Sequence, residues 1–210
     1  GLQQFSSYPI DSLQVVGQIR TDIIPRLKEK RSSLTIDSID SNRRTILYPS
    51  QPLYVGEEKM RERLALDFLK LTVDFPEIQF VVKPHPKELD CETYFEQLSK
   101  RVNGANFQVV RQDLYKLLAL SDTVIIYNST VGAEAIYFRK PLIVMNYSDN
   151  DFSGFVKSGI ATGAKNYESL KACIQQSNEA GNSAVEEFIQ NRAFKIDGKV
   201  SERIYKKVTE

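Results

Sequence analysis

The chain has 210 residues, a suitable length for one ordinary domain with a substantial core. Apolar residues make up 41% and charged residues 26%, the balance typical of globular proteins, and the net charge is only +1. Such a charge excludes recruitment of nucleic acid or of an anionic membrane by an overall field, so a local site must hold any anionic ligand.

Cysteines and histidines are too few for a metal centre. Cys91 and Cys173 lie far apart and His85 is the single histidine, so we expect neither a metal site nor a disulfide framework. Reduced thiols suit a cytoplasmic protein. No apolar stretch approaches the roughly 20 residues that span a bilayer, and no signal peptide is recognisable. The opening GLQQFSSYPI lacks an initiating Met, as we expect of an excised segment.

Apolar runs alternate with helical patterns along the middle of the chain. In chain order we expect a strand at 44–50, a helix at 56–74, a strand at 78–83, a helix at 91–102, a strand at 107–110, a helix at 113–121, a strand at 123–127, a helix at 130–138 and a strand at 141–146. Continuously apolar strands are buried on both faces, as in a parallel sheet. The repeated strand–helix order therefore predicts a doubly wound α/β fold.

The two flanks of this region have different patterns. Residues 27–43 are polar and poor in core residues, which predicts a surface loop or a disordered link. Residues 184–209 are helical in pattern, with a break near Asp197 and Gly198.

Polar clusters follow three of the expected strands, at 48–51, 83–86 and 128–132. In an open parallel sheet, ligands bind in the crevice at the carboxyl ends of the strands. The three clusters should therefore share one edge of the sheet, which makes that edge the candidate site.

The segment YNSTVGAEA begins at Tyr127 and leads from a strand into a helix. One hydroxyl of Ser129 or Thr130 is a natural N-cap, and the helix start also presents backbone N–H groups that suit a phosphate. Gly132 would allow a backbone or a ligand to approach closely. Glu134, one turn further, is either a solvent-facing helix residue or an acceptor for two sugar hydroxyls.

The segment KPHP surrounds His85 with two prolines that restrict its backbone. An imidazole can donate a hydrogen bond to a phosphate oxygen and can carry a proton near neutral pH. The alternative is a histidine that satisfies a loop carbonyl. Lys83 could add charge to a phosphate site or could simply be solvated.

These motifs carry a family resemblance. The order VVGQIRTD … ILYPSQ … VVKPHPKE … DLYKLLALSDTVIIYNSTVGAEAIYFRKPLIVMN … DGKVSERI resembles the C-terminal half of a GT-B glycosyltransferase, over about residues 15 to 207. More narrowly, it resembles capsule-polysaccharide synthesis transferases, CDP-glycerol glycerophosphotransferases and bacterial sialyltransferases, which carry an His-Pro motif and a later Ser/Thr motif. The resemblance implies a Rossmann-like domain that binds a nucleotide-activated donor.

The resemblance also implies roles for individual residues. His85 would be the catalytic residue, binding the donor phosphate and stabilising the departing nucleotide, and Glu134 would meet the ribose. The chain near Val110 and Arg111 would border the nucleobase. The full set of nucleotide-binding residues that we expect is Ser50, Gln51, Lys83, His85, Arg111, Asn128, Ser129, Thr130, Gly132 and Glu134.

The family likeness further suggests a CMP- or CDP-linked donor, with UDP as the other candidate, and no metal or other cofactor requirement. Residues 1–26 would contain the segment that crosses between two domains and a first strand, and residues 44–210 would form the donor-binding domain. A glycan or lipid-linked acceptor would bind through an N-terminal domain missing from this chain, so the fragment alone should be inactive. Peripheral association of the full-length protein with the inner face of the membrane would agree with such an acceptor.

Two other functional classes remain open. A sugar-nucleotide 2-epimerase shares the architecture, although we would expect a Gly-Gly-containing Asp-Ser segment where this chain has NSTVGAE. A non-catalytic nucleotide-binding module in a polysaccharide assembly complex is the third class, since the catalytic base would lie outside this chain.

Overall fold

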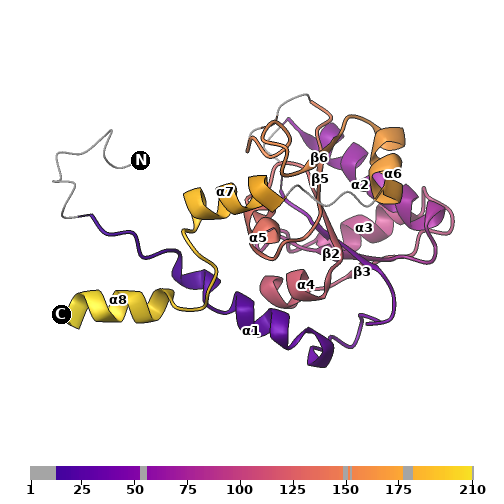
Figure 1. Ribbon diagram of the computed structural model, residues 1–210. Helices are drawn as coiled ribbons and strands as arrows, with labels where there is room; N and C mark the ends of the chain where they lie inside the picture. Colours follow the sequence, from indigo (N-terminus) through magenta and orange to yellow (C-terminus); the bar gives the residue numbers. More distant parts are fainter. Residues whose placement is uncertain (1–12, 53–55, 149–150, 152, 177–181, 210) are drawn as a thin grey trace.

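The computed structural model describes residues 13–52, 56–148, 151, 153–176 and 182–209. Its centre is a parallel sheet (Figure 1). The sheet has six strands in the order β3-β2-β1-β4-β5-β6. The strands are β1 (Thr45–Pro49), β2 (Gln79–Lys83), β3 (Gln108–Val109), β4 (Thr123–Ile126), β5 (Leu142–Met145) and β6 (Thr162–Ala164). The order reverses beside β1, as in a doubly wound sheet, so the predicted α/β Rossmann-like fold class is confirmed.

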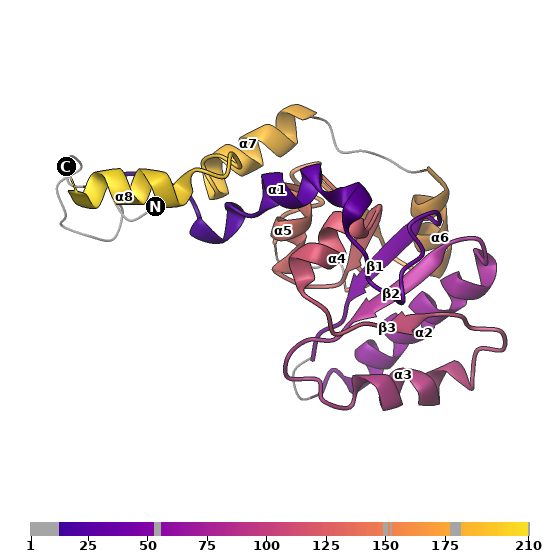
Figure 2. The same cartoon turned by 90° about the horizontal axis from the view of Figure 1, so that it is seen from below.

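Helices cover both faces of the sheet (Figure 2). The helical elements are η3 (Ile19–Thr21), α1 (Ile24–Glu29), η4 (Arg31–Ser33), α2 (Glu58–Asp74), α3 (Cys91–Ser99), α4 (Leu114–Leu120), α5 (Val131–Tyr137), α6 (Tyr167–Gln176), α7 (Asn182–Arg192) and α8 (Val200–Thr209). Among these described helices, none is long and apolar enough to cross a membrane.

Alternation along the strands divides the core into two layers. Leu47, Val81 and Val124 face one layer, together with α1, α4, α5 and α7. Ile46 and Phe80 face the other layer, together with α2, α3 and α6. Both faces of each central strand are therefore buried, which explains why these strands are continuously apolar in sequence.

The segment before β1 is helical or irregular where the structure describes it. Residues 13–26 contain η3 and the start of α1 and no strand, and the remainder of the range in which we expected a first strand lies outside the described residues. Residues 27–43 contain the end of α1 and η4 and are otherwise irregular, and Leu34, Ile36 and Ile39 pack against the core. The spacings between these side chains, two residues and then three, follow neither a strand period nor a helix period throughout, so the pattern did not indicate their burial.

Helix α8 extends away from the sheet and lies beside η3 (Figure 1). Its first turn is capped by Asp22, from the far end of the chain. One carboxylate oxygen of Asp22 accepts from Val200 N–H at 2.7 Å, and the other accepts from Ser201 N–H at 2.8 Å and from Ser201 Oγ at 2.7 Å. Helix starts have N–H groups without partners in the helix, and an anion satisfies them well.

Replacing Asp22 with alanine should therefore loosen α8, at a cost of about 0.5–2 kcal/mol for the lost cap. Burial opposes ionisation of Asp22, but the hydrogen bonds from Ser201 and Val200 outweigh it and lower its pKa. The cap thus stabilises the fold at neutral pH and is lost as the pH falls through the lowered pKa. Amide hydrogen exchange in α8 measures the effect, with the exposed Asp37→Ala as control; unchanged protection of α8 would contradict it.

Candidate functional site

The three predicted polar segments lie at one edge of the sheet. Strands β2, β1 and β4 are neighbours and run parallel, so their carboxyl ends face the same way. Pro49 pairs with Lys83 at the ends of β1 and β2, and Ser50 N–H donates to the Lys83 carbonyl at 3.0 Å. The edge predicted to bind a ligand is therefore a real feature of the fold.

His85 lies in a tight turn directly after β2. Glu88 N–H donates to the His85 carbonyl at 2.9 Å, which closes a β-turn over residues 85–88 with Pro86 in the position that proline favours. Lys87 N–H donates to Nδ1 of the His85 ring at 3.1 Å. Because Nδ1 accepts, the neutral ring carries its proton on Nε2, which is the nitrogen available to a ligand.

Glu88 organises this turn, and the sequence reasoning missed it. Its side chain is only 3% exposed, yet it is a carboxylate with three partners. One oxygen accepts from Ser50 Oγ at 2.5 Å and from His85 N–H at 3.1 Å. The other pairs with Arg61 Nη2 at 2.9 Å. The signal available in sequence was an acid three residues after His85, but its partners just after β1 and on α2 are 38 and 27 residues away.

Lys83 and Arg111 also lie near this turn. The Lys83 ammonium donates to the Pro84 carbonyl at 3.1 Å, and burial, with the nearby Arg111 charge, lowers its pKa. Arg111 forms a two-pronged ion pair with Glu92 at 2.5 and 2.7 Å and donates to the Glu88 carbonyl at 2.9 Å. The predicted residues Ser50, Lys83, His85 and Arg111 are thus brought together around one loop.

Of the residues predicted at the start of α5, Ser129 and Gly132 have structural roles, and Thr130 is exposed. Ser129 Oγ accepts from Val131 N–H at 3.2 Å, so the capping interpretation holds for this hydroxyl. Gly132 is buried, and a Cβ there would overlap the Phe155 ring and lie 2.8 Å from Ile126 Cδ1. The close approach predicted at Gly132 is therefore made by a side chain of this protein. Thr130 is exposed and its side chain makes no capping bond.

Glu134 is buried on α5, with only 4% of its surface exposed, so the solvent-facing alternative is wrong. Arg20 Nη1 pairs with Oε1 at 3.0 Å, while Oε2 has no hydrogen-bond partner among the described residues. Burial raises the pKa of Glu134, although Arg20 acts in the opposite direction. The Tyr115 hydroxyl, whose pKa rises to about 12 chiefly through burial and then through the Glu134 charge, is also buried without a partner among those residues.

A cavity of about 370 Å³ opens beside Glu134's helix. Two arginines, Arg20 from η3 and Arg192 from α7, give it positive charge. Neither arginine was predicted from sequence, because they are far apart in the chain and converge only through the fold. The complete lining is Gln18, Arg20, Thr130, Ala133, Tyr137, Ser153, Phe155, Phe188 and Arg192.

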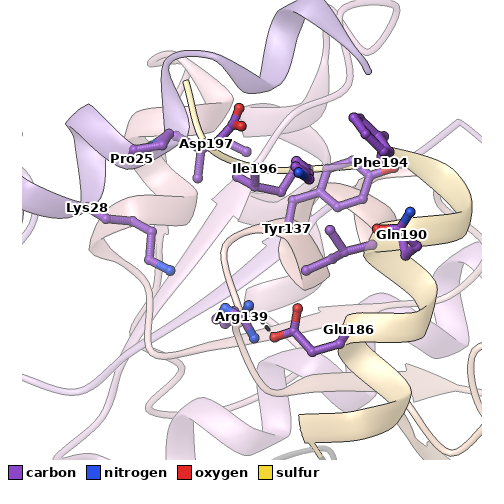
Figure 3. A pocket seen from close by; sticks show the side chains of 12 residues that line it. Pro25, Lys28, Tyr137, Arg139, Glu186, Gln190, Phe194, Ile196 and Asp197 are labelled. Carbon is purple, nitrogen blue, oxygen red and sulfur yellow. Dashed lines mark ion pairs between the residues drawn. The ribbon is translucent and has the colours of Figure 1, made fainter. Parts of the chain in front are cut away.

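A second cavity, of about 450 Å³, lies between α1, α5 and α7 (Figure 3). Tyr137 borders both cavities. Arg139 pairs with Glu186 across the second one, and Asp197 pairs with Arg203 at 2.7 Å. Because its carboxylates are already paired and its lining includes none of the predicted site residues, we place the candidate site in the first cavity and at the sheet edge.

The remaining predicted residues lie along the same edge. Gln51 and Asn128 are half-buried, each two residues beyond the end of its strand. Among the hydrogen bonds and ion pairs of the described residues, none joins the His85 turn to the Glu134 group. No cluster of three or more His, Cys, Asp or Glu side chains that could hold a metal ion occurs in the part of the chain that the structure describes.

The family model for "Capsule polysaccharide biosynthesis protein" matches residues 28–173, which is more than half of the chain. Lipid-A-disaccharide synthase 2 of Legionella pneumophila strain Lens is 23% identical over 142 residues, covering 67% of this chain and 34% of the relative. The enzyme of strain Philadelphia 1 is 27% identical over 137 residues, covering 63% and 34%. The chain thus spans about a third of the length of these curated relatives.

Solved structures resemble the fold along nearly all of the chain. UDP-GlcNAc 2-epimerase from Neisseria meningitidis, bound to UDP-GlcNAc, gives a TM-score of 0.62 at 19% identity, covering 99% of this chain and 57% of that one. The wall teichoic acid polymerase TagF, as its H444N variant with CDPG, gives 0.55 at 17% identity, covering 94% and 51%. These similarities agree with one Rossmann-like half of a GT-B architecture, as the sequence resemblance predicted.

Proposed function

Because the chain belongs to the family of capsule polysaccharide biosynthesis proteins, we propose that it binds the nucleotide-activated donor of a glycosyltransferase. The observation that carries this proposal is the group around Arg20, which pairs with Glu134 Oε1 and lines the cavity that also contains Arg192. The two arginines suit an anion, and the buried Glu134 Oε2, which has no partner among the described residues, can accept from a hydroxyl. A nucleotide satisfies both demands, since its ribose carries hydroxyls and its phosphates carry negative charge.

His85 would act on the phosphate at the neighbouring strand end. In glycosyl transfer the bond between the anomeric carbon and a phosphate oxygen breaks, and negative charge develops on the departing phosphate. The Nε2–H group of a neutral His85 can donate to that oxygen, because Nδ1 is already occupied by Lys87 N–H. Thr130, whose hydroxyl makes no capping bond, would add a second donor.

The donor's base and the acceptor extend the proposal. We favour cytidine, because the His-Pro and Ser/Thr motifs resemble those of families with CMP- or CDP-linked donors, and the polymerase neighbour was solved with CDPG. The epimerase neighbour was solved with UDP-GlcNAc, which makes UDP the necessary comparison. The base would lie near Val110 and Arg111. We further propose that the acceptor is a glycan or a lipid-linked molecule and that the reaction needs no additional cofactor. The reaction would take place in the cytoplasm, at the inner face of the membrane.

Calorimetric titration with CMP, CDP and UDP tests this function. We expect cytidine nucleotides to bind best, and His85→Ala to weaken binding by about 1–3 kcal/mol, the usual cost of losing a hydrogen bond to a charged group. Lys100→Ala, just beyond the C-terminal end of α3, is the control and should leave affinity unchanged. Absence of binding by this chain and by the full-length protein would reject the donor site.

A further inference from the structure

Glu88, in the turn after β2, is a buried carboxylate whose position is not explained by stability alone. Moving a charge out of water is costly, and a buried ion pair is often no more stabilising than apolar residues of the same volume. Glu88 nevertheless lies 3% exposed between β1, α2 and the turn after β2. Its three partners satisfy both oxygens, so the charge is held in one position.

The fixed Glu88 carboxylate determines the orientation of the His85 ring through the turn. Glu88 and His85 exchange two hydrogen bonds: His85 N–H donates to the Glu88 carboxylate, and Glu88 N–H donates to the His85 carbonyl. Between them, Lys87 N–H points at Nδ1 of the imidazole. A proton on Nδ1 would place a second donor against that N–H, so this geometry favours the tautomer with its proton on Nε2.

Ser50 and Arg61 connect the Glu88 carboxylate to the elements around the turn. Ser50 Oγ ties the carboxylate to the end of β1, and Arg61, which also stacks 3.9 Å over the Tyr94 ring, ties it to α2 and α3. We infer that Glu88 is a positioning residue, which fixes the turn so that His85 Nδ1 accepts from Lys87 N–H and Nε2–H remains for the donor's phosphate. The part of this inference that concerns phosphate rests on the proposed function.

Nitrogen-15 NMR of the imidazole tests the positioning directly. His85 is the only histidine, so its two ring resonances need no assignment by mutation. In the neutral ring we expect the Nδ1 and Nε2 shifts to be further apart than in free histidine, because one tautomer dominates. Glu88→Gln should narrow that separation, since one amide oxygen cannot accept from Ser50, His85 and Arg61 together. An unchanged separation would overturn the inference.

Matched variants separate positioning from general destabilisation. Glu62→Gln also removes a carboxylate that pairs with an arginine, Arg101, but away from the turn, and should leave the ring shifts unchanged. If Glu88→Gln unfolds the protein, Arg61→Ala replaces it, because it releases only one carboxylate oxygen and should also narrow the separation. Equal narrowing in Glu62→Gln would show that the ring responds merely to stability.

A double-mutant cycle tests the step from positioning to binding. Glu88→Gln should weaken CDP binding roughly three- to tenfold in the otherwise unchanged protein, and should add nothing in a His85→Ala background. Additive losses would show that Glu88 acts independently of His85 and would overturn the inference. If no nucleotide binds to the unmodified protein, the donor site itself fails, while the ring shifts still decide whether Glu88 orients His85.

Discussion

Replacing Phe68 with alanine should lower the free energy of unfolding by about 3–5 kcal/mol, the range for deleting a buried aromatic ring. Phe68 is 0% exposed on α2. Its ring stacks on Tyr48 at 4.7 Å and meets Phe80 and Phe95 edge-on at 5.7 and 6.4 Å. The substitution therefore removes apolar burial and three ring contacts at once, and leaves a cavity between α2, α3 and the sheet.

Urea denaturation followed by circular dichroism measures this loss. Val73→Ala on the same helix is the matched control, because Val73 is 40% exposed and its truncation should change stability by less than about 0.5 kcal/mol. A loss below about 1 kcal/mol for Phe68→Ala would mean that this layer can collapse around the missing ring. Since Tyr48 lies two residues before Ser50, such looseness would also extend to the edge that we propose for the donor.

The strands could be predicted from sequence where both of their faces are buried, but the edge strand β6 could not. β1, β2, β4 and β5 are continuous apolar runs because a helix layer covers each face. β6 is Thr162–Ala164, three residues with a glycine at the centre, and among the described strands it pairs with β5 alone. Neither its composition nor its length separates it from a loop, so β6 was missed. The following α6 was also missed, although its buried Leu170 and Ile174 have helical spacing.

Some residues of the candidate site could likewise be predicted from sequence, and others could not. Polar residues at strand ends were predictable, because chain order alone determines which edge of a parallel sheet they occupy. Glu88 and Arg20 were not predictable, because their importance depends on partners 27 to 114 residues away, and Arg192 reaches the same cavity as Arg20 from α7, near the other end of the chain. Gly132 had a sound reason to be glycine, but the group that needs the space is Phe155. Local pattern indicates where a site lies, while tertiary contacts decide which of its residues remain available.

Replacing Glu134 with glutamine should have opposite effects on binding and on stability. If the carboxylate accepts two ribose hydroxyls, losing its charge weakens both hydrogen bonds, at about 1.5 kcal/mol each, and lowers nucleotide affinity roughly a hundredfold. Without ligand, the same change should stabilise the fold at neutral pH, because it removes a buried charge of which one oxygen has no partner among the described residues. Calorimetry with CDP and thermal melts of the free protein measure the two effects.

The pH dependence identifies the cause. Burial raises the pKa of Glu134 in the folded protein, so protonation of this carboxyl favours the folded state. Its favourable contribution is fully present below the unfolded-state value of about 4.3 and is lost as the pH rises through the folded value. The stability advantage of Glu134→Gln should therefore be near zero at about pH 4 and grow toward neutral pH. Glu186→Gln, at an exposed carboxylate that pairs with Arg139, should show no such growth. If Glu134→Gln were more stable than the unmodified protein by the same amount at every pH, the difference would come from packing. It would then not come from a buried charge kept for a ligand's hydroxyls.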